Sequence, residues 1–349
     1  MILFLRNCRG PHYFFWWIGG IFVTAVLCII TSAVAVPSGR LMLNSGWSLP
    51  VYRSQLDGQI VSSTAEIIPQ VLGIMIDNHP NARPQAGLEQ ASIVYEVPVE
   101  GSFTRYMALF PFSAGVGKVG PVRSARPYFI DWLSEYGDAY YLHSGGSPQA
   151  LQRLKNGEDG LRDVNEFRFG SFFARDYQRY APHNLYTPSE SWAALGAHFS
   201  SAMINWLPTL FVTDTMPLDG DRASSVAFSY ATDYALEWRY VPDLGTYQRF
   251  VNGRPYLAAS GEQLAATTIV IQFVDVEIID GEGRKAITTI GSGKAFVVRG
   301  GRVIRGTWQK NTLHERTRWF DPRGAEIPLV PGPIWIEVVN AAQAVELTN

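Results

Sequence analysis

The sequence has little cysteine and little lysine, and each shortage excludes a kind of protein. Its two cysteines, Cys8 and Cys28, stand near the amino terminus, so the chain beyond them has no disulfide and no cysteine metal site. Lysine occurs 5 times against 24 arginines, and the net charge is −2 without a run of basic residues. This balance argues against a nucleic-acid binder.

Signatures of common catalytic sites are also missing. The sequence contains no HExxH, GxSxG or GxGxxG motif and no Walker loop. We therefore expect neither a metal ion nor a cofactor, and function has to be inferred from clusters of side chains. With 349 residues, of which 47% are hydrophobic and 17% charged, the chain has enough apolar surface for one or two packed cores.

An uncharged apolar run over residues 14–36 predicts one membrane-spanning helix. Arg6 and Arg9 precede the run, and the aromatic residues over 13–17 are typical of a membrane interface. We therefore expect residues 1–36 to form a cytoplasmic stub and a single-pass anchor in the cell membrane. The rest of the chain is then expected outside the cytoplasm.

Two alternatives to a retained anchor stay open. The sequence Ala33-Val34-Ala35 has the form of a signal-peptide cleavage site, although the apolar run is longer than a usual signal core of about 7 to 15 residues. Lipidation of Cys28 is disfavoured, because Leu27 stands where a small residue is expected.

Strand and helix patterns alternate over residues 70–220. Short apolar runs predict strands over 71–76, 92–97, 103–112 and 138–143. Proline followed by apolar residues at helical spacing predicts helices over 127–136 and 148–155. After a linker over 37–69, we therefore expect an α/β layered amino-terminal domain.

The pattern changes after about residue 210, where short strand-like runs are separated by NG, DG, GG and PGP turn signals. Residues 221–349 are therefore expected to form a mostly β carboxy-terminal domain. The fold class predicted for the whole chain is α+β.

Arginines gather in a predicted hairpin over 103–126, which carries Arg105, Arg123 and Arg126. The guanidinium group presents a fixed fork of donors that suits phosphate or carboxylate. Ser124 or Arg126 is expected to cap the helix that follows, whose first amide groups favour an anion. The hairpin is therefore a candidate anion-binding site.

The loop after the strand over 138–143 is a second candidate for anion binding. It contains Ser144, Gly145, Gly146 and Ser147, of which the glycines leave room for a ligand and Ser147 caps the next helix. Successive strand-to-helix junctions place their loops at one edge of a sheet, where ligands of open α/β sheets bind. Helix caps and surface ion pairs are the alternative explanation for the loop and the arginines.

A polar group after the strand over 71–76 has the residues of a proton-transfer site. Asp77 and His79 are candidate catalytic residues, because histidine exchanges protons near neutral pH and aspartate can orient it. Arg83 is a candidate ligand contact. An Asx turn closed by Pro80 explains the same residues, and a metal site is a third interpretation.

Three more residues complete the candidates. His143, at the end of a predicted strand, is a further candidate catalytic residue. His183 and Asn184 are candidate ligand contacts, although a turn explains His183 as well.

Several strings share their order and spacing with a known protein family. The first four are IMIDNHPNARPQAGLEQASIVYEVPVEGSFTRY, KVGPVRSARPYFIDW, HSGGSPQAL and APHNLYT, and the others are IVIQF, GSGKAFVVRGGRVIRGTWQK and PGPIWIEVV. They resemble the amino- and carboxy-terminal domains of the YerB-like family of predicted bacterial lipoproteins. The resemblance covers about residues 70–345 and implies a bacterial envelope protein with two domains and no assigned activity. The chain departs from the family in lacking a good lipobox.

Two functions are compatible with these residues. The first is a binding module for an anionic envelope component, such as a phosphate-bearing polymer or a peptide carboxylate. The second is a transferase or hydrolase on such a substrate, in which an aspartate or histidine moves a proton. A deep pocket with an imidazole or carboxylate facing the arginines favours the enzyme, and a shallow groove favours binding.

Overall fold

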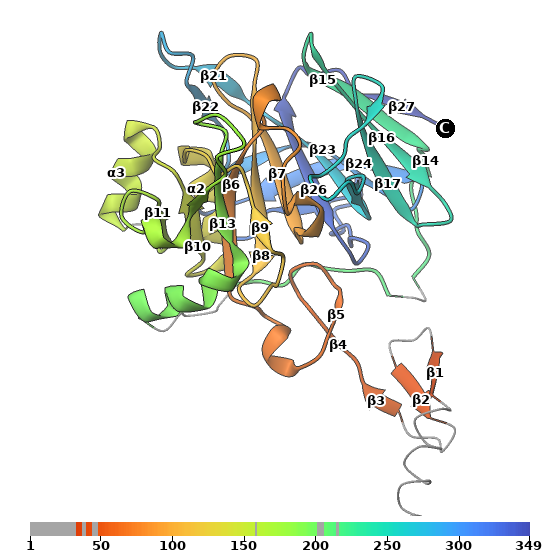
Figure 1. Ribbon diagram of the computed structural model, residues 1–349. Helices are drawn as coiled ribbons and strands as arrows, with labels where there is room; N and C mark the ends of the chain where they lie inside the picture. Colours follow the sequence, from red (N-terminus) through yellow and green to blue (C-terminus); the bar gives the residue numbers. More distant parts are fainter. Residues whose placement is uncertain (1–32, 37–39, 44–47, 158, 201–205, 214–215) are drawn as a thin grey trace, which may run out of the picture. The chain divides into compact units, whose positions relative to one another are not determined.

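The computed structural model describes residues 33–36, 40–43, 48–157, 159–200, 206–213 and 216–349 (Figure 1). The predicted membrane helix lies outside these ranges, as do Arg6, Arg9, Cys8 and Cys28, except that residues 33–36 form the strand β1 (Ala33–Val36). The helix predicted to end at Val36 is therefore wrong at its carboxyl end, where β-branched valines suit a strand. Within the described ranges, no helix has the length and apolar character needed to cross a membrane.

The chain divides into two compact units. The smaller unit comprises residues 1–52 and 213–215, and its described part holds a three-stranded antiparallel sheet. The strands of this sheet are β1, β2 (Arg40–Leu43) and β3 (Ser48–Pro50). The larger unit comprises residues 53–212 and 216–349 and contains the central sheet and the candidate site.

An eleven-stranded mixed sheet is the framework of the larger unit. Its strand order is β11-β10-β6-β8-β7-β26-β20-β23-β24-β14, with β25 beside β24. The strands are β6 (Val71–Asp77), β7 (Ile93–Pro98), β8 (Thr104–Pro111), β10 (Tyr140–His143), β11 (Arg162–Asn165), β14 (Asp221–Arg222), β20 (Thr268–Val274), β23 (Gly291–Arg299), β24 (Arg302–Lys310), β25 (Arg318–Phe320) and β26 (Ile334–Asn340). The four strands predicted before residue 150 are confirmed as β6, β7, β8 and β10.

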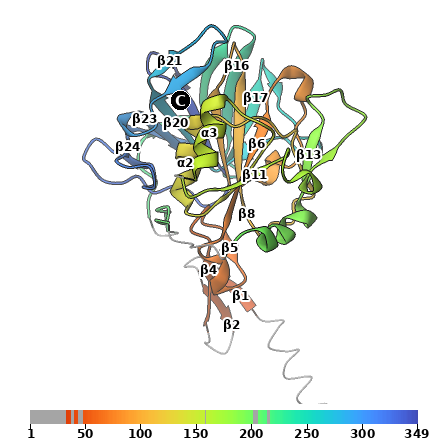
Figure 2. The ribbon, with the colours of Figure 1, turned by 90° about the vertical axis from the view of Figure 1, so that its left-hand side faces the viewer.

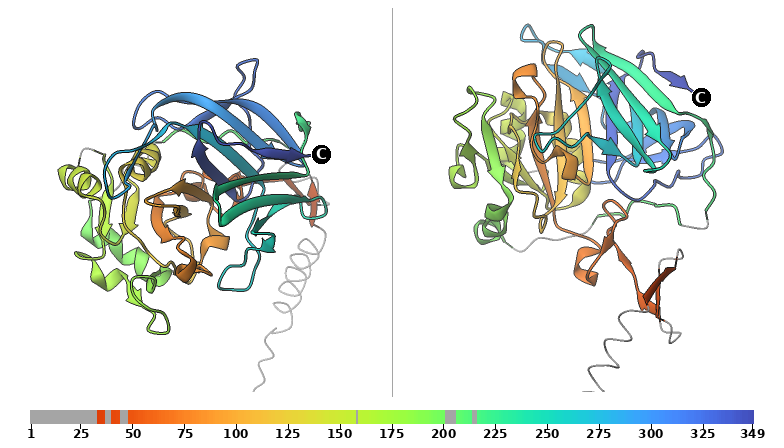
Figure 3. Two further views of the ribbon diagram at one scale, coloured as in Figure 1. Left: turned by 90° about the horizontal axis from the view of Figure 1, so that it is seen from above. Right: turned by 45° about the vertical axis from the view of Figure 1, so that its right-hand side comes forward.

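The two halves of the sequence share this sheet. Strand β26 pairs in parallel with β7 on one side, where Ile334 faces Ile93, and with β20 on the other, where Ile334 faces Thr268. Figure 3 shows the orange strands of the amino-terminal half beside the blue strands of the carboxy-terminal half. The boundary expected near residue 220 stays a prediction, but a continuous hydrogen-bonded sheet crosses from one half to the other.

Two short α-helices pack beside β6 and β10, and Figure 2 shows them together. They are α2 (Pro127–Leu133) and α3 (Pro148–Asn156), each beginning at the predicted proline. Close packing of α2 depends on Gly73 of β6, because a Cβ there would lie 2.7 Å from Leu133 Cδ1. In its described residues the protein is mostly β with few helices, and the α/β layering stays a prediction.

Smaller sheets and helical turns complete the described chain. A six-stranded sheet has the order β18-β17-β16-β15-β27, with β19 beside β17, while β12-β13-β9 and β21-β22 form two others. The strands are β4 (Tyr52–Arg53), β5 (Ile60–Val61), β9 (Lys118–Val119), β12 (Ala174–Arg175), β13 (Leu185–Pro188), β15 (Ser225–Ala231), β16 (Tyr234–Val241), β17 (Thr246–Val251), β18 (Arg254–Pro255), β19 (Ala265–Ala266), β21 (Val276–Ile278), β22 (Lys285–Ile287) and β27 (Glu346–Thr348). The 3-10 turns are η1 (Thr64–Glu66), η2 (Pro80–Ala82), η3 (Leu88–Gln90), η4 (Ser134–Tyr136), η5 (Gly170–Phe172) and η6 (Ser189–His198).

Both faces of the central sheet are buried, which explains why β6 is apolar throughout. Leu72 and Ile74 point to one face and pack in a core that includes Trp238 of the six-stranded sheet. Met75 points to the other face and packs in a core that includes Trp132 of α2. The site described next lies where β6 ends.

The hairpin predicted over 103–126 is wrong. Strand β8 pairs with β6 and β7, whereas β9 pairs with β13. The chain after β9 runs past the end of β6, where Val122 bridges Ile76, and then past the 144–147 loop, where Ala125 bridges Gly146. Arg105, Arg123 and Arg126 are nevertheless brought together. The segment after β9 crosses the end of β6, and β6 pairs with β8, which carries Arg105.

Candidate anion-binding pocket

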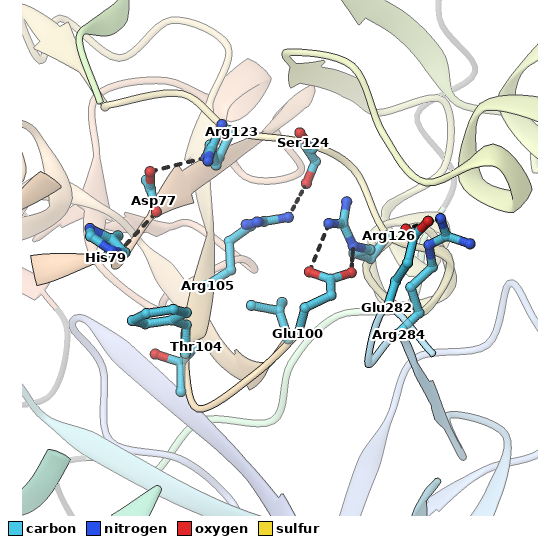
Figure 4. A pocket seen from close by; sticks show the side chains of 12 residues that line it. Asp77, His79, Glu100, Thr104, Arg105, Arg123, Ser124, Arg126, Glu282 and Arg284 are labelled. Carbon is cyan, nitrogen blue, oxygen red and sulfur yellow. Dashed lines mark hydrogen bonds and ion pairs between the residues drawn. The ribbon is translucent and has the colours of Figure 1, made fainter. Parts of the chain in front are cut away.

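A pocket of about 320 Å³ opens where β6 ends and β8 begins, with the β21–β22 hairpin at its side. Its lining residues are Asp77, His79, Val99, Glu100, Phe103, Thr104, Arg105, Arg123, Ser124, Arg126, Glu282 and Arg284 (Figure 4). Of the candidate residues from the sequence, the pocket brings together Asp77, His79, Arg105, Arg123, Ser124 and Arg126. It does not include Arg83, His143, the loop from Ser144 to Ser147, His183 or Asn184.

Asp77, the last residue of β6, is the buried carboxylate of the pocket. Its Oδ2 accepts a hydrogen bond from His183 Nδ1 at 2.7 Å and lies 3.0 Å from Arg123 Nε. Its Oδ1 accepts the backbone amide of His79 at 3.0 Å, which is the predicted Asx turn. Asp77 therefore neutralises Arg123 and fixes the orientation of His183.

His79 stands in the pocket wall with its ring between two others. The ring stacks on His183 with centroids 4.6 Å apart and lies 4.8 Å from Phe103. His79 Nδ1 accepts the amide of Asn81 at 3.2 Å, so the neutral ring carries its proton on Nε2. Burial lowers the pKa of His79, and the charges of His183 and Arg123 lower it further. His79 is thus a neutral hydrogen-bond donor at physiological pH.

Arg105, the second residue of β8, is a buried cation without a carboxylate partner. Its Nη1 donates to the carbonyl of Ser124 at 2.7 Å, and its Nε has no hydrogen-bond partner. Arg105 is buried, with 7% of the residue exposed. None of the ion pairs among the described residues includes it. Burial, followed by the charge of Arg126, lowers the pKa of Arg105 to about 10, so the group stays charged at neutral pH.

The other two arginines of the pocket are already neutralised. Arg126 binds Glu100 through two hydrogen bonds, Nε to Oε1 at 2.5 Å and Nη2 to Oε2 at 2.8 Å. Burial opposes ionisation of Glu100, but these bonds and the charge of Arg126 lower its pKa. Arg284 pairs with Asp280 at 3.0 Å and with Glu282.

The β21–β22 hairpin is held against the amino-terminal half by Lys285. The Lys285 ammonium donates to the carbonyls of Val99 and, at 3.2 Å, of Gly101. The hairpin thereby places Glu282 and Arg284 at the pocket, so both halves of the sequence contribute to it.

His143 does not line the pocket, and its predicted catalytic role stays a prediction. Its Nδ1 lies 2.7 Å from the carbonyl of Gly145 and its Nε2 lies 2.7 Å from Asp163 Oδ1. Both ring nitrogens are therefore used in bracing the loop that follows β10.

The loop from Ser144 to Ser147 contacts the backbone of the segment that carries Arg123. Ser147 caps α3 as predicted, accepting the amide of Ala150 at 3.3 Å, and Ser144 donates to Glu166. The amide of Ser144 also donates to the carbonyl of Arg123 at 3.0 Å. Ser144 thus holds the backbone of Arg123, and the predicted ligand contacts Gly145, Gly146 and Ser147 hold the backbone of Ala125.

Arg83 and Asn184 also have partners elsewhere. Arg83 donates to Asn78 Oδ1 at 3.0 Å and lies over the ring of Tyr234. Asn184 accepts a hydrogen bond from Arg175 Nη1 at 3.0 Å. Of the distal candidates, His183 reaches the pocket residues, through Asp77.

The sequence analysis missed a second group of charges, buried between the two large sheets. Arg249 of β17 pairs with Glu96 of β7 and, at 2.7 Å, with Glu337 of β26, and all three side chains are fully buried. Asn78, next to Asp77, donates to Glu96 at 3.1 Å and to Tyr234 at 2.8 Å. The signal in the sequence was a glutamate inside each apolar run, SIVYEV and IWIEVV.

No three His, Cys, Asp or Glu side chains in the described part of the chain are placed to hold a metal ion.

Comparisons with known proteins match both halves of the chain. The family described as "Protein of unknown function (DUF3048) N-terminal domain" matches residues 58–201, and its C-terminal domain matches residues 225–336. A protein of Bacillus subtilis (strain 168), named "Putative lipoprotein YerB", is 32% identical over 285 residues, which cover 80% of this chain and 83% of that protein. The crystal structure of YerB from Bacillus subtilis superposes with a TM-score of 0.73 at 30% identity, over 84% of this chain and 99% of that one.

Proposed function

The chain belongs to the DUF3048 family, and from this premise and the geometry above we propose that it binds an anionic ligand in the pocket around Arg105. The ligand carries a phosphate or carboxylate group and belongs to the bacterial cell envelope. The protein acts there as a binding module.

The observation that carries this proposal is that Arg105 is a buried cation without an ion pair, since Asp77 and Glu100 act on its charge but are paired with other residues. A buried cation without a counter-ion destabilises a protein, because water no longer solvates it. Arg105 lines the pocket, and no ion pair of the described residues includes it, so an oxyanion bound in the pocket can supply a counter-charge and accept hydrogen bonds from its guanidinium. The site therefore gains most from a bound anion.

Two neighbours add donors to the same place. His79 offers Nε2–H, since its Nδ1 already accepts a backbone amide. Arg123 keeps its terminal nitrogens for a ligand, because its contact with Asp77 is made through Nε. Together with Arg105 they supply the several donors that the oxygens of a phosphate group accept.

The location rests on the sequence and on the relatives. The apolar run over 14–36 and the lipoprotein named among the relatives both support association with the cell membrane. We propose that the larger unit faces the outside of the cytoplasm, where envelope polymers carry phosphate and carboxylate groups.

Calorimetric titration tests this function. The full-length chain in detergent should bind inorganic phosphate, and the affinity should fall as salt rises. Arg105→Met should weaken binding by roughly tenfold or more, since a hydrogen bond to a charged group contributes about 1.5 to 3 kcal/mol. Arg239→Met, which changes an arginine in an exposed pair with Glu237, is the matched control. If the parent binds neither phosphate nor acetate, or if Arg105→Met binds like the parent, the proposal fails.

One observation supports an alternative function as transferase or hydrolase. His183 does not line the pocket but stacks on His79 and contacts Asp77, which do, and when its Nδ1 donates to Asp77 the lone pair of Nε2 is free, the arrangement of a general base. Hydrolysis of p-nitrophenyl phosphate by the parent and its loss in His183→Gln, with phosphate binding retained, would support the enzyme. If the parent protein does not hydrolyse p-nitrophenyl phosphate, the enzyme alternative fails and the binding function stands.

A further inference from the structure

We infer that the ligand of this pocket is a phosphorylated sugar or polyol, in which the phosphate binds at Arg105 and the hydroxyl groups bind at Glu100 and Glu282. The inference rests on the proposed anion binding and specifies the class of ligand. It follows from what lies beside the anion-binding donors.

Besides Asp77, two carboxylates line the pocket that holds the buried cation. Figure 4 shows Arg105 with Asp77 and His79 on one side, and with Glu100, Arg126 and Glu282 on the other. A carboxylate only accepts hydrogen bonds, so a ligand group that bonds to Glu100 or Glu282 must carry an N–H or O–H donor. A ligand that extends over this part of the pocket must therefore offer donors.

Each carboxylate has acceptor capacity left for such donors. Glu100 receives two hydrogen bonds from Arg126, and Glu282 receives one from Arg284, whereas an ionised carboxylate has about four acceptor positions. The side chain of Glu282 is 72% exposed, so a hydroxyl group can reach it. The hydroxyl groups of a sugar or polyol provide such donors without adding a second charge.

An apolar surface completes the arrangement. Phe103 is 40% exposed at the pocket, and its ring packs against His79. An exposed aromatic ring at the rim of a polar pocket suits the C–H face of a sugar or the carbon chain of a polyol. A bare phosphate ion would leave this ring uncovered.

The experiment compares ligands by calorimetry with the full-length chain in detergent. The probes are inorganic phosphate, acetate, glucose, glycerol 3-phosphate and glucose 6-phosphate. We expect at least one of the two phosphorylated compounds to bind tenfold or more tightly than inorganic phosphate, and glucose alone to bind undetectably. Acetate should bind more weakly than phosphate.

Three variants separate the parts of the site. Phe103→Ala and Glu282→Gln should each lower the affinity for the phosphorylated compound fivefold or more and leave inorganic phosphate unchanged. Arg105→Met should lower both, and Glu237→Gln, in an exposed ion pair outside this pocket, should change neither. If inorganic phosphate or acetate binds as tightly as both phosphorylated compounds, the ligand class is wrong while anion binding stands. If no phosphate compound binds, the proposed function itself fails.

Discussion

Asp77 and Arg105 are paired directly across β6 and β8, yet the carboxylate of Asp77 contacts His183 and Arg123, and Arg105 is left without a carboxylate. Asp77, the cross-strand neighbour of Arg105, is thus committed to other partners. Arg105 therefore lines the pocket without an ion pair.

The first prediction concerns the stability of Arg105→Met. Replacing a deeply buried arginine usually lowers the free energy of unfolding by several kcal/mol, because a partner carboxylate loses its counter-ion. Arg105 has no such partner, so we expect the free energy of unfolding in urea to change by less than about 1 kcal/mol while phosphate binding is lost. A large loss of stability together with unchanged binding would assign Arg105 a purely structural role.

The second prediction concerns Arg249, the opposite case. Arg249→Met leaves Glu96 and Glu337 buried without their shared cation, and breaking a buried pair in this way costs about 3 to 5 kcal/mol. Urea unfolding at pH 8 measures the loss. Arg239→Met, in an exposed pair nearby, should cost about 0 to 1 kcal/mol. Similar effects of the two variants would show that the buried group contributes little.

The third prediction concerns pH. Burial raises the pKa of Glu337 to about 7 from an ordinary 4.5, with Glu96 acting in the same direction and Arg249 and Trp238 opposing. Below pH 4.5 the group is protonated whether the chain is folded or unfolded, and above pH 7 it is ionised in both states. Between these values only the unfolded chain releases the proton, so the free energy of unfolding should fall as the pH rises, by on the order of 3 kcal/mol.

Glu337→Gln tests the assignment of this effect. Chemical unfolding at a series of pH values should show a shallower fall between pH 4.5 and 7 for the variant than for the parent. Tyr230 also donates to Glu337, so Tyr230→Phe checks that the fall does not depend on that hydroxyl group. Equal slopes for Glu337→Gln and the parent would place the titrating group elsewhere.

The fourth prediction concerns cleavage between the halves. Met216, Asp219 and Gly220 are exposed, and a protease that cuts before Asp219 should nick the chain there first. Because β26 pairs with both β7 and β20, the two fragments should elute together from a sizing column and separate in urea. Fragments that separate in native buffer would show that the halves are independent domains.

Elements whose signals are local were predictable from the sequence. The strings SVAFSYA, YALEWRYV and RVIRGTWQK are β15, β16 and β24 residue for residue, because alternation and turn signals mark both ends. The helix starts at Pro127 and Pro148 follow from the fixed backbone angle of proline.

Partners distant in sequence were not predictable in this way. The pattern of β8 indicates a strand but not its neighbours, and the assumption that it pairs with the next segment produced the wrong hairpin. The contact between His183 and Asp77 spans 106 residues and has no local signal. Arg249 could have been found, because alternation along β17 places it on the same inward face as Tyr247 and Val251.

The position of β26 also determines when, during synthesis of the chain, the central sheet can fold. Residues 334–337 pair with residues 93–96, so the central sheet cannot close until the ribosome has released the chain through residue 337. Until then β7 and β20 each present an unpaired, apolar edge, which is a template for aggregation. A chain that is interrupted before Ile334 therefore keeps the edges of both strands unpaired. Such a chain is prone to aggregate unless the cell shields or degrades it.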